Sequence, residues 1–424
     1  MTRDRSDLDF GGILGAWMND AAPSSIPVVV LEEAFARTMA APQARVYPWQ
    51  RLARRSSHPR RLTLLSIAAT AALLVGVLGL GVFGGGSGIG PGPSPSPSPT
   101  AIPSRTPSPT AIASPSPSPF PAIQIVPTAS VAVVTPQALA TDGTAVWVLS
   151  QTGSVARIDP ATNTLGTSVQ TGATDDFYQG ISVGANGVWV TEWNNAKLYR
   201  VGPTSLKVVA AIPVGLAPKG VLATEAAVWV ADTHDGKVYR IDPQTNKIVA
   251  TIAVGPTGTS GPNWLASGLG SIWVDIPNNQ TVVRIDAVTN AIQATIPIPD
   301  IVTPCGGFAV TTAAVWNLTC DGSQGMTRID PTTNTVVTAV KLDEQGYNPA
   351  VIGGVPWVSI FTGDSNPGRL GRISAATNAI DLELAPGPTF GGGGDLVQAA
   401  GSVWVIDGGN DRVLRLPLAG FSPS

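Results

Sequence analysis

A tryptophan returns at a nearly constant interval through the C-terminal part of the chain, and no other feature limits the fold as strongly. Successive members lie 42, 40, 44, 43, 41 and 47 residues apart. A repeat of roughly 40 to 45 residues, built from four short strands, is typical of a β-propeller blade. The repeats are marked by Trp147, Trp189, Trp229, Trp273, Trp316, Trp357 and Trp404. Seven units predict an all-β, seven-bladed β-propeller.

Each repeat has the same internal order of strands and turns. Stretches such as KVYRI (237–241) and KIVATIAV (247–254) alternate in polarity with the period of a β-strand. An arginine follows each tryptophan: Arg157, Arg200, Arg240, Arg284, Arg328, Arg372 and Arg415. After the first six comes a turn of the type D-P-x-T-N, in which Asp accepts backbone N–H groups and Asn tolerates the left-handed region. Each unit is predicted to be a four-stranded antiparallel meander, with the Trp and Arg in structural roles.

The seventh unit reaches only its third strand, RVLRLPLAG (412–420). A strand-like stretch, IQIVPTASVAVV (123–134), stands before the first complete unit. An unpaired sheet edge invites aggregation, so we expect 123–134 to supply the outer strand of the blade that holds Trp404. The propeller domain is then expected to span residues 123–424.

The segment before the propeller contains one long apolar stretch. Residues 62–83 carry no charge over 22 positions, enough for a helix to cross a hydrocarbon core of about 30 Å. Five arginines precede this stretch between residues 51 and 61, whereas Arg105 is the only charge between it and the propeller. Because positive charge marks the cytoplasmic side, 62–83 is predicted to be a single-pass membrane anchor with a cytoplasmic N-terminus and an extracytoplasmic propeller. A cleaved signal peptide is disfavoured, since no A-x-A-like site follows.

Two further segments flank the predicted anchor. Residues 84–122 are Gly-rich and then Pro/Ser/Thr-rich, with twelve prolines from residue 91 to 122. This composition favours an extended polyproline II linker that could reach ~100 Å. Residues 1–61 are predicted to be a cytoplasmic head with a short helix over Pro27–Met39. The head resembles those of membrane-anchored proteins in high-GC bacteria, some of which are anti-sigma regulators, although it has no His-x₃-Cys-x₂-Cys zinc-ligand set.

The charge balance argues against one class of partner. The chain holds 25 basic and 28 acidic residues, and from residue 123 onward 15 basic and 22 acidic residues give 15 − 22 = −7. The basic residues form no patch within the blades, so no nucleic-acid partner is expected.

A meander blade carries its connections on two faces. The turns between first and second and between third and fourth strands share one face, here called the turn face, and are nearly uniform. The loops between second and third strands and the crossovers between blades share the opposite face, here called the loop face. These differ from unit to unit, as in EWNNA (192–196), DTHDG (232–236) and GPTGTSGPNW (255–264). Variable loops on a rigid scaffold commonly carry binding residues. The ligand-binding candidates are Tyr178, Trp193, Asn194, Asp232, His234, Trp264, Asp275, Tyr347 and Phe390.

Catalytic chemistry has one candidate cluster. His234 is the only histidine in the propeller and lies beside Asp232 and Asp235, so it could act as a general base. A metal site needs two or three more converging ligands, which the sequence does not supply, so neither a metal nor a cofactor is expected. No G-x-S-x-G nucleophile motif, phosphate-binding glycine loop or haem attachment site is present.

The chain has two cysteines, both in the fifth unit. Cys305 begins the first strand of that unit and Cys320 ends the second, with their connecting turn (311–314) midway. This arrangement predicts cross-strand neighbours within disulfide reach, and an extracytoplasmic location favours oxidation. Two unrelated buried thiols are the alternative.

The repeat stretch VWVADTHDGKVYRIDPQTNKIVATIAVG (228–255) resembles YVTN-type propellers. The units also resemble, more distantly, the streptogramin B lyases (virginiamycin B lyases), whose blades carry a W-x-T-E…I-x-R-I pattern matched best by VWVTEWNNAKLYRV (188–201). The resemblance covers about residues 123–420 and implies a propeller. For the lyases it further implies His and Glu groups with a magnesium ion on the loop-bearing face. Here Glu192 matches only the repeat pattern, and His234 has no second histidine to join it.

These observations leave three function classes open. We favour an extracytoplasmic binding or scaffolding module at the cell surface, with a cell-wall glycan or a protein as ligand and no enzymatic activity. The alternatives are a carbon–oxygen lyase of the streptogramin B type, with Mg²⁺ or Ca²⁺ as cofactor, and a surface sensor coupled to the cytoplasmic head. Fold resemblance alone is a poor warrant for chemistry.

Overall fold

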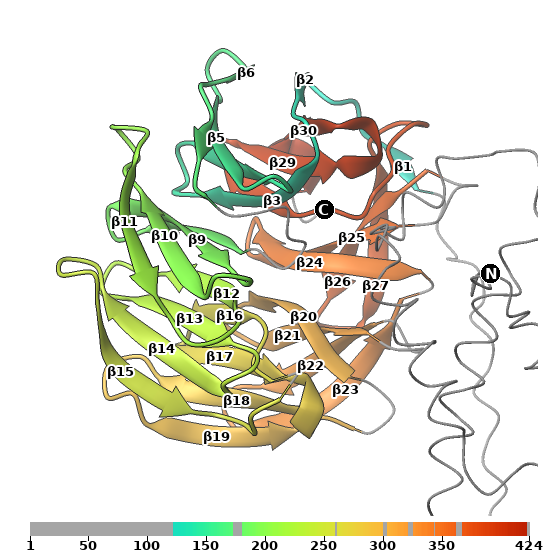
Figure 1. Cartoon of the computed structure of the whole chain (residues 1–424). Helices are drawn as coiled ribbons and strands as arrows, with labels where there is room; N and C mark the ends of the chain where they lie inside the picture. Colours follow the sequence, from blue (N-terminus) through green and yellow to red (C-terminus); the bar gives the residue numbers. More distant parts are fainter. Residues whose placement is uncertain are drawn as a thin grey trace, which may run out of the picture. The chain divides into compact units, whose positions relative to one another are not determined.

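A computed structural model describes residues 122–172, 180–258, 261–299, 303–320, 325–342, 344–361 and 367–421. They form seven sheets arranged in a ring (Figure 1), which confirms the predicted seven-bladed propeller with four-stranded antiparallel blades. The predicted head (1–61), the predicted anchor (62–83) and the linker up to residue 121 lie outside the described residues. Within the ranges given above, no helix has the length and apolarity needed to cross a membrane.

The strands of equivalent position fall into four sets. The inner strands of blades one to seven are β3 (Pro136–Thr141), β8 (Ile181–Gly184), β12 (Pro218–Ala223), β16 (Leu265–Gly268), β20 (Thr303–Val310), β24 (Gln345–Ile352) and β28 (Leu396–Ala399). The second strands are β4 (Val146–Ser150), β9 (Gly187–Glu192), β13 (Val228–Asp232), β17 (Ser271–Ile276), β21 (Val315–Cys320), β25 (Val355–Phe361) and β29 (Ser402–Asp407).

The third strands carry the repeated arginine. They are β5 (Ser154–Asp159), β10 (Lys197–Val201), β14 (Lys237–Asp242), β18 (Thr281–Asp286), β22 (Gly325–Asp330), β26 (Arg369–Ser374) and β30 (Arg412–Pro417). The outer strands are β6 (Thr164–Leu165) with β7 (Val169–Gln170), β11 (Val208–Pro213), β15 (Lys247–Ala253), β19 (Ile292–Pro297), β23 (Thr335–Lys341), β27 (Ala379–Ala385) and β2 (Ala129–Ala132). Short 3₁₀ turns are η2 (Pro277–Asn279), η3 (Gly408–Asn410) and η4 (Leu418–Phe421).

The ring closes through its inner strands. Each inner strand contacts the inner strand of the next blade, and β28 of the last blade contacts β3 of the first. A cavity of about 360 Å³ lies between these strands, lined by residues of β3, β8, β12, β20, β24 and β28 and by Asp395.

The seven repeat tryptophans fill the interfaces between blades. All seven are 0–1% exposed. Trp229 packs with Ile272 and Val274 of the next blade, and the same arrangement recurs around the ring to Trp404, which packs with Val146 of the first blade. The structural role predicted for the tryptophan is therefore confirmed.

Each repeat arginine lies directly opposite the tryptophan of its own blade, as in the Trp189–Arg200 and Trp273–Arg284 pairs. Five of these arginines also donate two hydrogen bonds of 2.6–3.2 Å to the turn of the next blade, one to a carbonyl and one to the Asn side chain. We call this pair of bonds a latch. The latches join Arg200 to Pro243 and Asn246, Arg240 to Val288 and Asn290, Arg284 to Pro331 and Asn334, Arg328 to Ala375 and Asn378, and Arg415 to Pro160 and Asn163.

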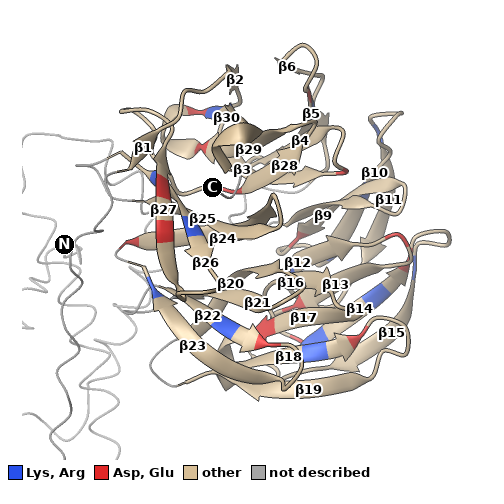
Figure 2. Ribbon diagram, turned by 180° about the vertical axis from the view of Figure 1, so that it is seen from behind, with Lys and Arg blue, Asp and Glu red and all other residues tan. Residues whose placement is uncertain are grey.

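The receiving asparagines have positive φ angles, 54° to 65°, as the turn type predicts. The same five latch arginines lie over their tryptophan rings at 4.9–5.5 Å. In Figure 2 basic residues accordingly colour the ribbon of third strands such as β18 and β22. Each latch thus stabilises one blade interface on the turn face.

Two of the seven interfaces lack the latch for identifiable reasons. The turn of blade two places Leu206 where the asparagine stands elsewhere, and Arg157 of blade one is exposed, with no latch. Blade seven has no turn between its third and outer strands, since its outer strand comes from the N-terminal side. Arg372 of blade six therefore pairs with Asp381 of its own blade at 2.8 and 3.3 Å.

The segment predicted to close the ring is divided between two blades. Ala129–Ala132 (β2) pairs antiparallel with β30 and is the outer strand of blade seven, as expected. Ile123–Gln124 (β1) instead pairs in parallel with β27 and adds a fifth strand to blade six. The prediction of one continuous closing strand over 123–134 was wrong, because the chain bends between these two pairings.

The cysteines lie on paired strands of blade five, where Thr303 is the direct neighbour of Cys320. Cys305 follows two residues later, where the register shifts between Pro304 and Phe308. The side chain of Cys320 lies outside the described residues, so the disulfide stays a prediction.

Candidate functional site

The loop face over blades two to four brings together most of the described candidate residues. Trp193 and Asn194 lie in the loop after β9, and His234 in the loop after β13. Trp264 immediately precedes β16, and Asp275 lies near the end of β17. The hydroxyl of Thr233 donates to Pro262 O at 3.0 Å and lies 3.2 Å from Asn263 Oδ1. These contacts hold the His234 and Trp264 loops side by side.

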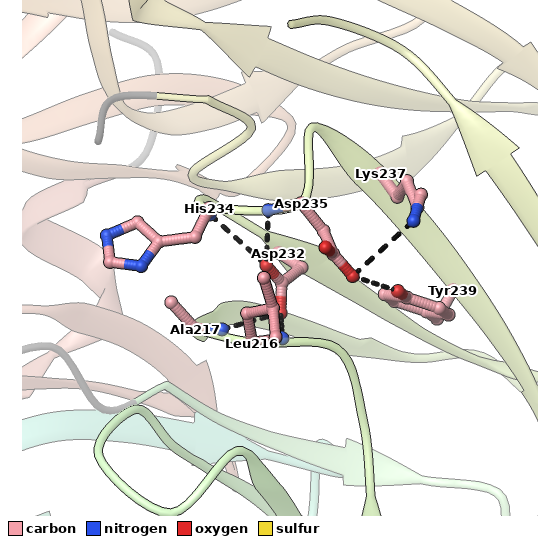
Figure 3. A network of polar contacts seen from close by, with 7 residues as sticks. All are labelled: Leu216, Ala217, Asp232, His234, Asp235, Lys237 and Tyr239. Carbon is pink, nitrogen blue, oxygen red and sulfur yellow. Dashed lines mark hydrogen bonds and ion pairs between the residues drawn. The ribbon is translucent and has the colours of Figure 1, made fainter. Parts of the chain in front are cut away.

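Asp232 organises its own loop (Figure 3). Its side chain is fully buried. Oδ1 accepts the backbone N–H groups of His234 and Asp235 at 3.1 and 2.8 Å, and Oδ2 accepts those of Leu216 and Ala217 at 2.7 and 2.8 Å. Both carboxylate oxygens are thus occupied by the backbone. The geometry gives Asp232 a structural role.

The same device occurs in two other blades. Glu192, also three residues after its tryptophan, accepts the N–H groups of Asn194 and Asn195 at 3.0 and 2.6 Å. Asp407 accepts the N–H of Gly391 at 3.0 Å and pairs with Arg412 at 2.7 Å. A buried carboxylate at this position fixes the loop that follows the second strand.

The predicted catalytic cluster does not converge. Figure 3 shows the imidazole of His234 directed away from Asp232 and Asp235. The ring instead meets the ring of Trp193 edge-on, with centroids 4.9 Å apart. Asp235 accepts a short hydrogen bond from the Tyr239 hydroxyl and lies 3.6 Å from the Lys237 ammonium. The two carboxylates bind backbone N–H groups and Tyr239 instead of the imidazole, so the three side chains do not form the predicted cluster.

A second charged pair, absent from the catalytic prediction, lies deeper under the loop face. Asp275 is fully buried, and its Oδ1 accepts the Trp264 N–H at 2.6 Å. Its Oδ2 is buried without a hydrogen-bond partner. Burial raises the pKa of Asp275 to about 7, although the Trp264 N–H and the charge of Lys219 act in the opposite direction.

Lys219 is the cationic member of this pair. It lies on β12, and burial lowers its pKa while the Asp275 carboxylate raises it. The Lys219 ammonium lies 5.5 Å from the centre of the Trp264 ring. The Lys219 carbonyl accepts the Thr191 hydroxyl of blade two at 2.5 Å. Lys219 therefore connects the inner strand of blade three with β9 of blade two and with Trp264, which precedes β16 of blade four.

The remaining candidates lie elsewhere. Phe390 is 1% exposed and packs in the hydrophobic core between blades six and seven, so it has no surface for a ligand. Tyr347 is half-buried on β24, and burial raises its pKa. Asn194 is exposed. Tyr178 lies outside the described residues.

Metal ligands are not grouped in the part of the chain that the structure describes: no cluster of three His, Cys, Asp or Glu side chains suitable for an ion occurs there.

The axial cavity is bordered by hydrogen bonds that join the inner part of one blade to that of another. Asp395 accepts the Leu139 N–H at 3.0 Å and the Asn348 side-chain amide at 2.7 Å. Burial raises the pKa of Asp395. Both of its carboxylate oxygens therefore accept hydrogen bonds from neighbouring inner strands, β3 and β24.

Sequence reasoning missed Lys219 and Asn263. Lys219 stands in PKGVLA (218–223), where a lone lysine looks like an ordinary surface residue. One signal was nevertheless available. Within the residue ranges of the seven inner strands given above, Lys219 is the only charged residue, and a charge on the innermost strand of a blade is unexpected.

No protein-family model matches the chain, and no curated protein matches it. Among solved structures, hydrazine synthase from Kuenenia stuttgartiensis is similar with a TM-score of 0.55 at 13% identity, over 67% of this chain and 96% of that one. The Pan2 WD40 domain of Neurospora crassa gives a TM-score of 0.53 at 10% identity, over 70% of this chain and 97% of that one. These likenesses show the fold alone: a seven-bladed β-propeller.

Proposed function

We propose that this protein is an extracytoplasmic β-propeller that acts as a binding or scaffolding module, held at the cell surface by residues 62–83 and the Pro-rich linker. Its ligand contacts the loop face over blades two to four. One observation carries the proposal: half-buried Trp193, His234 and Trp264 gather there above the buried Asp275. Rigid, partly exposed aromatic side chains with a few polar groups beneath them are typical of binding surfaces.

The proposal also accounts for the division between the two faces. The turn face repeats one set of side chains whose hydrogen bonds join neighbouring blades. The loops over blades two to four instead differ from one another, and they keep aromatic rings partly exposed. A propeller that served only as a spacer would have no need of this difference.

The test is a binding screen with the full-length protein against isolated cell-wall polysaccharides and an array of surface proteins. We expect a ligand whose affinity falls at least tenfold in Trp193→Ala and Trp264→Ala. Arg157→Ala, on the turn face, is the matched control and should bind as the wild type does. A ligand that both tryptophan variants bind with unchanged affinity would contradict the proposed face.

Catalysis of the streptogramin B lyase type is the alternative function. The resemblance of the repeats to YVTN-type propellers bears on the fold and favours neither function. The geometry of His234 does not favour catalysis, because its imidazole is directed away from Asp232 and Asp235 (Figure 3). If the wild type turns over a substrate and His234→Ala abolishes turnover, the binding proposal is wrong. A sensor coupled to the head (1–61) has no specific observation in its favour.

Membrane topology and the disulfide belong to the same proposal. Protease treatment of intact cells should remove the propeller and leave the head protected; the opposite pattern would refute the topology.

For Cys305 and Cys320, mass spectrometry of non-reduced peptides should find the two joined. The paired strands already hold this short loop, so loss of the disulfide should lower the free energy of unfolding by only ~1–3 kcal/mol.

A further inference from the structure

The buried oxygen of Asp275 is the strongest sign of a ligand on the loop face. A buried carboxyl oxygen without a donor lowers the free energy of unfolding, because its lost contacts with water are not replaced. Most buried polar groups in folded proteins have a partner. Oδ2 of Asp275 has none, although Oδ1 of the same group is held at 2.6 Å by the Trp264 N–H. The carboxyl is therefore fixed in place, and when it is ionised, above its pKa of about 7, Oδ2 is an acceptor left for a group that donates.

The neighbours of this acceptor limit the charge of what can bind. Lys219 lies close enough for its charge and that of Asp275 to shift each other's pKa. A cationic ligand would meet the Lys219 ammonium, and an anionic ligand would meet the Asp275 carboxylate. In a poorly solvated site such like-charge contacts are strongly unfavourable. The pair thus favours a neutral ligand that both donates and accepts hydrogen bonds.

The aromatic residues supply the second requirement. Trp264 and Trp193 are half-buried, and each is held by a packed partner, Lys219 and His234 respectively. Held in this way, the indoles offer apolar area with little loss of side-chain entropy on binding. A ligand for this site therefore needs an apolar face as well as hydroxyl or amide groups.

We infer that the loop face over blades two to four is a site for a neutral saccharide, with Trp193 and Trp264 contacting the C–H face of a sugar ring and Asp275 accepting from a sugar hydroxyl. A pyranose combines a C–H face with several hydroxyl donors, and no charge is needed. Because Oδ2 is buried, a neighbouring side chain must move to admit the hydroxyl, and we assign this movement to Lys219, whose ammonium can donate to a second hydroxyl. The inference rests on the proposed binding function and names its ligand class.

The test measures binding of the full-length protein to three matched probes: the neutral N-acetylglucosamine hexamer, its de-N-acetylated cationic form, and the anionic galacturonate hexamer. We expect the neutral hexamer to bind at least tenfold more tightly than either charged one. Asp275→Asn keeps the size of the side chain and the acceptor for the Trp264 N–H, yet should weaken binding at least tenfold. Trp264→Ala is the second variant and Arg157→Ala the control, and thermal unfolding checks that all three are folded.

Each alternative result has a separate meaning. Preference for a charged hexamer, or undiminished binding by Asp275→Asn, would overturn the saccharide site. If no hexamer binds while a surface protein binds through Trp193 and Trp264, the saccharide inference fails and the binding function stands. If neither saccharides nor proteins bind through these tryptophans, the binding function fails as well.

Discussion

The aspartates of the turn face and Asp275 under the loop face are the same side chain in opposite electrostatic environments. Asp242, Asp286 and Asp330 are half-buried turn residues whose pKa values are lowered, chiefly by the backbone N–H groups of Gln244, Thr289 and Thr332. Burial instead raises the pKa of Asp275 to about 7. The turn face uses carboxylates as charged acceptors that fix the chain. The loop face holds Asp275, whose burial disfavours the ionised form. A carboxyl kept in such a place suits the binding role proposed above.

The largest expected effect tests that contrast at Asp275. Between pH 3.8 and about 7 the folded protein keeps a proton on Asp275 that the unfolded chain has lost. The free energy of unfolding should therefore fall as pH rises through this window, by no more than about 4 kcal/mol for a shift of this size. Urea unfolding of Asp275→Asn should lack this fall. An unchanged pH slope in the variant would mean that Asp275 is ionised throughout.

The second effect compares two equivalent arginines on the turn face. Arg200→Ala removes a latch with bonds of 2.7 and 3.1 Å and should lower the free energy of unfolding by about 2 kcal/mol. Arg157→Ala, at the same position of a blade without a latch, should change it by less than about 0.5 kcal/mol. Denaturant unfolding followed by tryptophan fluorescence measures both. Equal losses would show that packing of the arginine, rather than the latch, matters.

A smaller effect should come from building the missing latch. Leu206 already has a φ of 49°, close to the 57° of Asn246, so Leu206→Asn suits the backbone of the turn. The new amide can accept from Arg157, but the apolar contacts of Leu206 with the neighbouring core are lost. We expect a net gain of about 0.5 kcal/mol. The gain should disappear in the Arg157→Ala background, and a gain that persists there would have another cause.

The smallest effect concerns an aspartate on the turn face. Asp330 accepts the Thr332 N–H at 2.7 Å, and its pKa is lowered. Its contribution is present above the unfolded pKa of 3.8 and is lost as pH falls through the lower folded value. Asp330→Asn should therefore be slightly less stable than the wild type at pH 7 and equal to it at low pH. The opposite pH trend would remove the contrast with Asp275.

The sequence predicted the fold because its strongest signals are local and repeated. The tryptophan spacing indicated the number of blades, and the turns related to D-P-x-T-N indicated the third connection in the first six. The closing strand was predicted only in part, since nothing in residues 123–134 indicates that Ile123–Gln124 pairs with blade six. Pairing across hundreds of residues depends on where the chain bends, which local patterns do not record.

The candidate site was less accessible to prediction, and Asp232 and Asp275 show why. Both are acidic residues near the end of a second strand, yet one follows its tryptophan by three residues and the other by two. Side chains alternate between the faces of a strand, so this single-residue difference places them on opposite faces. Asp232 meets four backbone N–H groups, whereas Asp275 meets Lys219 and Trp264. The one-residue offset of Asp275 can be read from the sequence. Its pairing with Lys219 cannot, because Lys219 lies on another blade.

The division of the N-terminal segment between two blades has a mechanical consequence. A pull on the chain at residue 122 first loads the two-residue pairing of β1 with β27 and only then the pairing of β2 with β30. The first can detach without opening the ring, since blade six keeps its own four strands. Its release would free the chain up to β2 and take up extension before tension reaches β2. The ring closure made by β2 is thus preceded along the chain by a weaker pairing that gives way first.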